Sequence, residues 1–222
     1  MSDGGRREQE ERILRDFHRL YFDGPAGEGR VHHRTTWMGV PCLKTPLDLW
    51  MYQEILFDWR PSLVVETGTH KGGSALFLAH VLDAIGSGEI ASVDVLADAG
   101  RPSHPRIRWV TGSSADPAVL DPIFSGRDPT ERRMVILDSD HSKPHVLDEL
   151  AQLAPRVGPG GWLIVEDTNV NDHPVLPEHG PGPWEAVEEF LAKNPEWERD
   201  RSKEKFLLTY NPGGYLRRRT RS

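Results

Sequence analysis

Short apolar segments alternate with helical segments between residues 61 and 194, and this alternation constrains the fold more than any other feature. The apolar segments are SLVVETG, EIASVDV, IRWVTGS, RRMVILDSD and GWLIVEDT, which have the length and residue types of buried strands. Segments with apolar residues at helical spacing lie between them, for example GGSALFLAHVLDAI and KPHVLDELAQLAP. Strands joined through helices make right-handed crossovers and form a parallel sheet with helices on both faces.

Two closing strands are expected near residues 197–201 and in KFLLTY (residues 205–210), with only a charged turn between them. Because no helix separates them, one of the two must run antiparallel at one end of the sheet. The sequence therefore predicts a Rossmann-like, doubly wound, seven-stranded sheet that is mostly parallel, with one antiparallel strand near the C-terminus.

Two helices are expected before the first strand, over about residues 8–21 and 46–59. Thr45 is a suitable N-cap for the second helix, and Pro46 suits its first turn. We assign residues 1–60 to an N-terminal helical segment and cap, and residues 61–222 to a single globular domain.

The composition excludes several classes of function. The chain of 222 residues carries a net charge of −7, whereas a nucleic-acid binder would show a basic footprint. No apolar run has the length of a membrane span, and the first ten residues lack an apolar signal core. The single Cys42 rules out an intrachain disulfide framework, so a reducing cytoplasm is expected.

Polar side chains follow five of the predicted strands, at the point where each strand ends. They are Glu66, Asp94, Ser113, Asp138 and the pair Glu166-Asp167. Because ligands of such sheets bind beyond the carboxyl ends of the strands, we expect these residues to surround a ligand.

The first strand–helix junction, VVETGTHKGGSA, indicates the kind of ligand. Its glycines lack the G-x-G-x-x-G spacing of a dinucleotide fold, and no P-loop motif is present. Glu66 suits a cationic amino group, and Asp94 can accept hydrogen bonds from ribose hydroxyls. S-adenosylmethionine has both groups, although the glycines alone are also compatible with a simple tight turn. The expected cofactor contacts are Glu66, Gly68, Thr69, Gly72, Ser74, Asp94, Ser113 and Asp138.

Six stretches resemble those of a class I methyltransferase and, more narrowly, of the cephalosporin hydroxylase family. They are residues 35–54, 64–79, 135–150, 165–170, 179–191 and 204–218. The resemblance implies that residues 61–222 form a class I methyltransferase domain. It also implies O-methyl transfer to a sugar of an antibiotic or another natural product, with S-adenosylmethionine and a divalent metal ion as cofactors.

Three carboxylates and a histidine are the candidates for the chemistry. Asp138, Glu166 and Asp167 offer the oxygen ligands that Mg²⁺ prefers, provided that the strand ends between the two consecutive acids. The resemblance favours Asp138 over Asp140 as a ligand and implies that His141 is the catalytic base. The alternative for His141 is that it merely caps the following helix.

Two other functions compete with methyl transfer: a non-catalytic methyltransferase-like scaffold and an NAD-linked oxidoreductase. The Pro- and Gly-rich stretch 169–184 is expected to form a lid over a small-molecule hydroxyl acceptor, with the N-terminal segment as a second wall. The apolar positions of the first helix suggest a homo-oligomer.

Overall fold

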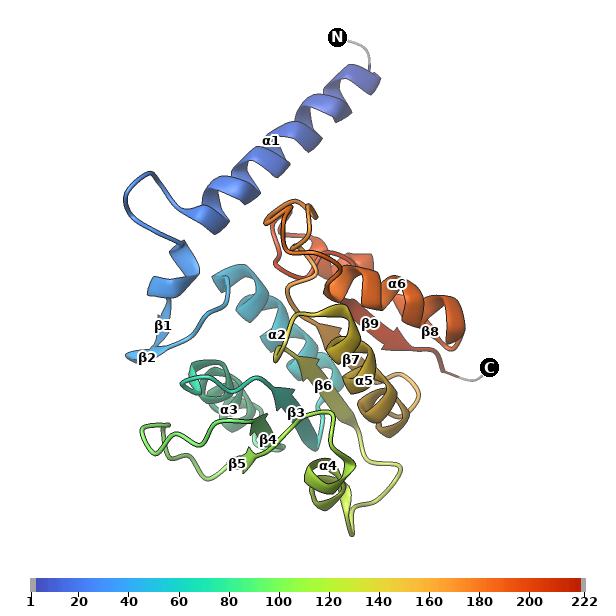
Figure 1. Ribbon diagram of the computed structural model, residues 1–222. Helices are drawn as coiled ribbons and strands as arrows, with labels where there is room; N and C mark the ends of the chain where they lie inside the picture. Colours follow the sequence, from blue (N-terminus) through green and yellow to red (C-terminus); the bar gives the residue numbers. More distant parts are fainter. Residues whose placement is uncertain (1–2, 221–222) are drawn as a thin grey trace.

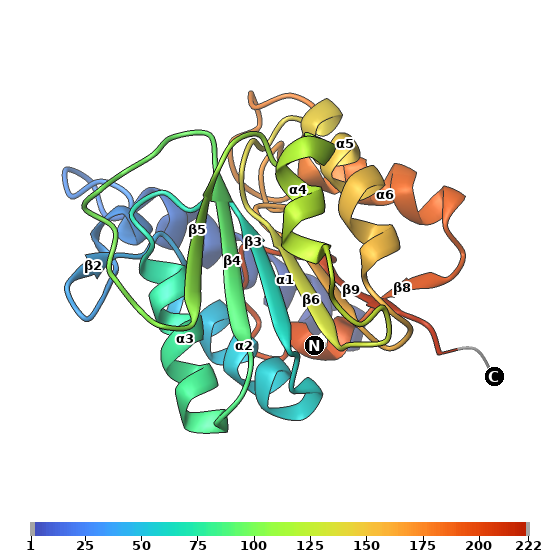
Figure 2. The same cartoon turned by 90° about the horizontal axis from the view of Figure 1, so that it is seen from below.

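Seven strands form one twisted sheet in the computed structural model of the protein, which describes residues 3–220 (Figures 1 and 2). The sheet order is β5-β4-β3-β6-β7-β9-β8. The strands are β3 (Leu63–Thr67), β4 (Glu89–Asp94), β5 (Ile107–Thr111), β6 (Arg133–Leu137), β7 (Trp162–Val165), β8 (Trp197–Arg199) and β9 (Tyr215–Arg218). Neighbours from β5 to β7 pair in parallel, and β9 runs antiparallel to both β7 and β8. The predicted fold class is confirmed.

Helices cover both faces of the sheet (Figure 2). They are α1 (Asp3–Asp23), α2 (Pro46–Trp59), α3 (Gly73–Ile85), α4 (Pro117–Phe124), α5 (Lys143–Leu153) and α6 (Pro183–Lys193). Side chains alternate along β3: Val64 packs with α2 and α3 on one face, whereas Leu63 and Val65 pack with α4, α5 and α6 on the other. Three 3₁₀ turns, η1 (Val31–Arg34), η2 (Ala154–Arg156) and η3 (Arg201–Glu204), and a short hairpin, β1 (Thr36–Trp37) and β2 (Val40–Pro41), complete the elements.

The second helix has the predicted bounds. The Thr45 hydroxyl accepts hydrogen bonds from the backbone N–H groups of Leu47 and Asp48, and Pro46 occupies the first helical position. The helix ends at Arg60, which adopts a left-handed conformation with φ of 49°.

The predicted strand over residues 205–210 is wrong. Leu207 has a φ of 69° and is 69% exposed, so the segment turns instead of extending along the sheet. The Tyr210 N–H donates to Asp48, and the Tyr210 ring packs against Phe22. The closing strand is β9, five residues farther on, and it lies between β7 and β8 and not at the edge of the sheet.

Helix α1 projects from the body of the protein (Figure 1). Only its C-terminal part is buried, at His18 and Phe22, whereas Ile13, Phe17 and Leu20 are at least half exposed. Its exposed apolar side chains fit the predicted self-association, which stays a prediction. Within residues 3–220, no helix is both long and apolar enough to cross a bilayer.

The stretch expected as a lid, residues 169–184, runs into α6, which begins at Pro183. Residues 169–182 contain no helix or strand and are tied to the start of α6 by Glu185. One Glu185 oxygen accepts hydrogen bonds from the Asn171 amide (2.8 Å) and from His173 Nε2 (3.0 Å). The other accepts from the Gly182 backbone N–H at 2.7 Å. Burial by itself would raise the pKa of Glu185, but these hydrogen bonds outweigh it and lower the pKa to about 2.

Glu185 should therefore make the stability of the protein depend on acid pH. A carboxyl whose pKa is lower in the folded state stabilises the fold above its unfolded pKa of 4.5, and this contribution fades as the pH falls toward about 2. We expect Glu185→Gln to lower the free energy of unfolding by about 1–3 kcal/mol near neutral pH. The difference should shrink in urea titrations at about pH 3. Glu188→Gln, at the exposed Glu188–Arg199 pair of the same helix, is the control. A Glu185→Gln effect that stays constant down to that pH would contradict the assignment.

Candidate active site

A cavity of about 1020 Å³ opens at the carboxyl ends of the parallel strands. The ends of β3 to β7 form one wall. The N-terminal segment, the 169–182 loop and the segment before β9 form the other. Residues that line the first wall include Gly68, Thr69, Ser74, Asp94, Gly112, Ser114, Asp138, His141 and Asp167. Residues that line the second include Phe22, Arg30, His32, Lys44, Val170, Leu176, His179 and Tyr210.

Gly68 allows the loop after β3 to pass close to the end of β6. Its φ is 78°, and a Cβ atom at this position would lie 1.7 Å from the backbone oxygen of Asp138. No other residue type fits there, so Gly68 fixes the distance between this loop and the acidic residues.

Glu66, Gly72 and Ser113 do not line the cavity, contrary to expectation. Glu66 is fully buried behind the loop, where its carboxylate accepts a 2.7 Å hydrogen bond from the Ser92 hydroxyl, and burial raises its pKa. Gly72 faces the Trp109 ring, and the Ser113 hydroxyl accepts a hydrogen bond from the Ala115 N–H. Glu66 is the second-last residue of β3, a strand inside the sheet, so its side chain supports the loop from behind.

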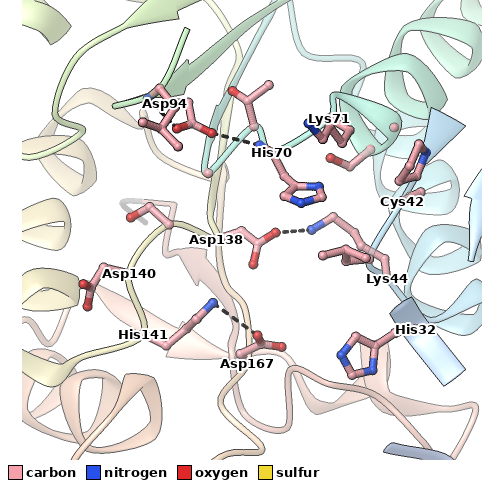
Figure 3. Close-up of a pocket in the computed structure, with 18 of the residues that line it drawn as sticks. His32, Cys42, Lys44, His70, Lys71, Asp94, Asp138, Asp140, His141 and Asp167 are labelled. Atoms are coloured by element: carbon pink, nitrogen blue, oxygen red, sulfur yellow. Dashed lines mark hydrogen bonds and ion pairs between the residues drawn. The ribbon is translucent and has the colours of Figure 1, made fainter. Parts of the chain in front are cut away.

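Asp94 lies at the end of β4 with its carboxylate held by the backbone. It accepts hydrogen bonds of 2.9 Å from the N–H groups of His70 and Leu96, and Arg101 lies 3.2 Å away (Figure 3). The carboxylate also borders the cavity, so it is a fixed acceptor for a polar ligand.

Asp138, His141 and Asp167 form a group with ligand atoms all within 4.8 Å of one another (Figure 3). His141 Nε2 lies 3.4 Å from Asp167 Oδ2, so the imidazole faces the cavity and does not cap α5. Asp140 lies outside this group because its carboxylate accepts a hydrogen bond from the Ser142 N–H. Two carboxylates and one imidazole at this spacing could hold a metal ion.

Glu166 does not belong to this group, although sequence analysis predicts it as a third metal ligand. Strand β7 ends at Val165, and Asp167 has a φ of 53°. This left-handed residue turns the Asp167 side chain into the cavity, while the Glu166 side chain is only 5% exposed. Glu166 Oε1 accepts hydrogen bonds from Lys44 Nζ (2.6 Å) and the Tyr52 hydroxyl (2.7 Å).

Lys44 is the functional candidate that sequence reasoning missed. Its ammonium group donates to Asp138 Oδ2 and to Glu166 Oε1, each at 2.6 Å, and its side chain is 2% exposed. Burial alone would lower the pKa of Lys44, but the neighbouring acids Asp138 and Glu166 raise it well above its usual value. The only signal in the sequence is a lysine among apolar residues directly before the Thr45 cap.

Asn211 connects the two consecutive acids. Its amide N–H donates to the Tyr52 hydroxyl at 2.9 Å, and its amide oxygen accepts from the Asp167 backbone N–H at 3.2 Å. Tyr52 in turn donates to Glu166, so helix α2 and the segment before β9 fix both acids from opposite sides.

Comparison with known proteins identifies the family. The family model described as Rhamnosyl O-methyltransferase/CmcI matches residues 29–219. The chain belongs to this family. The resemblance drawn from the sequence is thus confirmed, and the chain is an enzyme of the O-methyltransferase type.

A relative and two solved structures show how far the similarity extends. The Rhamnosyl O-methyltransferase of Mycobacterium leprae is 40% identical over 215 residues, which cover 93% of this chain and 91% of the relative. A structure of CmcI with Mg and S-adenosylmethionine has a TM-score of 0.65 at 19% identity, covers 90% of this chain and 84% of that one, and supports the fold alone. A structure of MycE, a methyltransferase of the mycinamycin biosynthetic pathway, contains Mg and the spent cofactor S-adenosylhomocysteine. It is 26% identical with a TM-score of 0.50, over 65% of this chain and 38% of that one.

Tyr52→Phe should destabilise the protein measurably. The substitution keeps the ring but removes the hydroxyl that serves both Glu166 and Asn211, and both partners are buried. Loss of a partner for a buried polar group costs about 1–3 kcal/mol, which denaturant unfolding can measure. Trp50→Phe is the matched control, because it removes only an exposed hydrogen bond to Glu54 on the same helix. Equal stability losses for the two variants would show that the buried hydrogen bonds carry no special weight.

Proposed function

We propose that the protein transfers a methyl group from S-adenosylmethionine to a hydroxyl of a sugar, with the help of a divalent cation. The acceptor is proposed to be a rhamnose-like residue of a glycosylated small molecule. The observation that carries the proposal is the Asp138–His141–Asp167 group, which shares one cavity with the glycine loop and Asp94. The Mycobacterium leprae relative is a rhamnosyl O-methyltransferase, which supports a rhamnosyl acceptor, and MycE belongs to the mycinamycin biosynthetic pathway, which supports a natural-product acceptor.

The cofactor half of the cavity is proposed to be the wall made by the strand ends. Asp94 accepts hydrogen bonds from the ribose hydroxyls, and the loop residues Gly68 and Thr69 contact the methionine part. Ser114, which lines the cavity where Ser113 does not, takes over the role proposed for Ser113. Glu66 acts indirectly through Ser92, whose hydroxyl also lies 2.7 Å from that of Thr69.

The donor set fits a hard divalent cation such as Mg²⁺. Asp138 and Asp167 offer carboxylate oxygens toward the cavity, and Glu166 adds a third carboxylate that shares Lys44 with Asp138. A bound divalent cation lowers the pKa of a hydroxyl that it contacts, which makes the hydroxyl a better nucleophile. The carboxylates would hold the ion at the end of the cavity that the strand ends form.

His141 is proposed as the general base. It accepts the hydroxyl proton while the acceptor oxygen forms a bond to the methyl carbon and the carbon–sulfur bond of the cofactor breaks. The sulfur keeps the electron pair, and S-adenosylhomocysteine leaves. Asp167, 3.4 Å from His141 Nε2, stabilises the protonated imidazole that results.

The acceptor half is proposed to be the wall made by the N-terminal segment and the 169–182 loop. Phe22, His32 and Tyr210 form an aromatic cluster, with His32 Nδ1 lying 3.2 Å from the Tyr210 hydroxyl. These three side chains are less than 9% exposed, so they form a rigid base for this wall of the cavity. Residues 1–60 would act as the cap through the part before α2, because α2 itself packs against the sheet. A cytoplasmic location also stays a prediction.

Methyl transfer can be tested with the mass spectrum of a simple rhamnoside incubated with S-adenosylmethionine and Mg²⁺. We expect a product heavier by one methylene group, and no product in excess EDTA. His141→Ala should lower kcat by roughly 100-fold or more, while isothermal titration shows unchanged S-adenosylhomocysteine binding. Full activity in EDTA would refute the metal role, and an unchanged rate for His141→Ala would refute the base. Absence of S-adenosylmethionine binding would leave the non-catalytic scaffold as the better description.

The acceptor wall can be tested at two neighbouring residues of the loop. His179 lines the cavity, whereas Glu178 does not, and both side chains are exposed. We expect His179→Ala to raise the KM for the rhamnoside roughly threefold or more, with unchanged affinity for S-adenosylhomocysteine. Glu178→Ala should leave both quantities unchanged. If both variants raised the KM equally, His179 would have no contact of its own with the acceptor, and the effect would come from a general disturbance of the loop.

A further inference from the structure

Lys44 holds two of the three acids that are proposed to hold the divalent cation. Its ammonium contacts Asp138 Oδ2 and Glu166 Oε1 at equal distances of 2.6 Å (Figure 3 draws the Asp138 contact). The side chain enters from the loop between β2 and α2 and is almost fully buried. Asp138 is also a member of the Asp138–His141–Asp167 group, so a single carboxylate belongs to both arrangements.

In the described part of the chain, Lys44 is the lysine that balances these acids. Within residues 3–220, neither Asp138 nor Glu166 forms an ion pair with any other lysine or arginine. Glu166 has the neutral Tyr52 hydroxyl as its other partner. The Glu166 side chain is 5% exposed and that of Asp138 is 21% exposed. A buried carboxylate without a counter-charge is strongly disfavoured, so the Lys44 ammonium stabilises Glu166 above all.

The ammonium and a divalent cation exclude each other at the same oxygens. Lys44 contacts one oxygen of each carboxylate, Asp138 Oδ2 and Glu166 Oε1. A cation bound to Asp138, Glu166 and Asp167 together would take these oxygens or the second oxygen of the same carboxylates, and in both cases it would lie close to the ammonium. Two positive charges at such short range repel each other, and the low polarity of the interior strengthens the repulsion. The ammonium therefore opposes the binding of an ion to Asp138 and Glu166.

We propose that Lys44 is a resident counter-cation that competes with the divalent ion for Asp138 and Glu166. It is a positioning residue: it holds the two carboxylates in place and lowers the affinity of the site for the ion. The inference rests on the proposed metal site, but it concerns ion affinity and not turnover.

The test measures the affinity of Lys44→Met and of the wild type for Mn²⁺, without cofactor or acceptor. The electron paramagnetic resonance signal of the free ion reports how much Mn²⁺ remains unbound. Mn²⁺ uses the same carboxylate ligands as Mg²⁺, and Met replaces the lysine stem with an unbranched apolar chain. We expect Lys44→Met to bind Mn²⁺ roughly tenfold or more tightly than the wild type. Equal or weaker binding would overturn the proposal.

Lys71→Met is the matched control. Lys71 also borders the cavity and also contacts an acid, with 2.9 Å between its Nζ and Asp98 Oδ2. Its side chain is 54% exposed, and its ion pair is with Asp98 and not with Asp138. Its removal should leave Mn²⁺ affinity within roughly twofold of the wild type, because exposed charges are screened. If Lys71→Met gained as much Mn²⁺ affinity as Lys44→Met, the loss of one positive charge from the protein would explain both gains, and the proposal would be overturned.

Thermal unfolding covers the case in which Lys44→Met folds poorly. The variant should unfold at a lower temperature than the wild type, and millimolar Mn²⁺ should raise its Tm by more than it raises that of the wild type. If the variant is unfolded in the absence of metal, Mn²⁺ should restore its circular dichroism spectrum, and failure to do so would overturn the proposal.

Mn²⁺ binding by the wild type distinguishes the proposed metal site from the proposed role of Lys44. If the wild type and the variant both fail to bind Mn²⁺, the metal role fails as a whole, whereas binding by the wild type without a gain in the variant refutes only the role of Lys44.

Discussion

The contact of one buried ammonium with two carboxylates joins the two halves of the molecule. Parallel strands deliver Asp138 and Glu166 to the same edge of the sheet, where their charges repel each other. Lys44 balances them from a segment that precedes the first strand of the sheet. Because the N-cap of α2 is the next residue, the start of this helix and the geometry of the active site are fixed together. Tyr52, two turns into the helix, adds a second contact with Glu166.

The sheet was predictable because its signals are local. The strands from β3 to β7 are apolar runs that end in glycine or acid, and α2 carries its own cap, Thr45, and its own first-turn proline. Residues 205–210 show where local signals fail. Their apolar residues suit a strand, yet they pack against the end of α1 and hydrogen bond to α2, both of which lie far away in the sequence. The true strand, β9, contains arginines that pack over Trp162 and Trp197, and the expected apolar alternation is weak there.

The site was predictable in its location and only in part in its contacts. Strand order places Asp94, Asp138 and Asp167 at one edge whatever the details, and all three border the cavity. The different directions of Glu166 and Asp167 depend on a left-handed residue that is not glycine, and the sequence gives no sign of it. Lys44 could not be assigned from its neighbours, because its partners lie 94 and 122 residues farther along the chain.

The two walls of the cavity differ in how they are built, and this difference has a consequence for how such enzymes diversify. One wall consists of strand ends whose positions are set by the core, so a change there disturbs the whole sheet. The other consists of irregular segments, around η1 and in residues 169–182, that contribute nothing to the two clusters on the faces of the sheet. Val170 and Val175 pack instead in a smaller third cluster with Phe22. Insertions and substitutions in surface segments of this kind are tolerated far better than in the core. Enzymes with this fold can therefore change their acceptor through substitutions in these two segments, while the wall made by the strand ends, where the methyl donor is proposed to bind, stays the same.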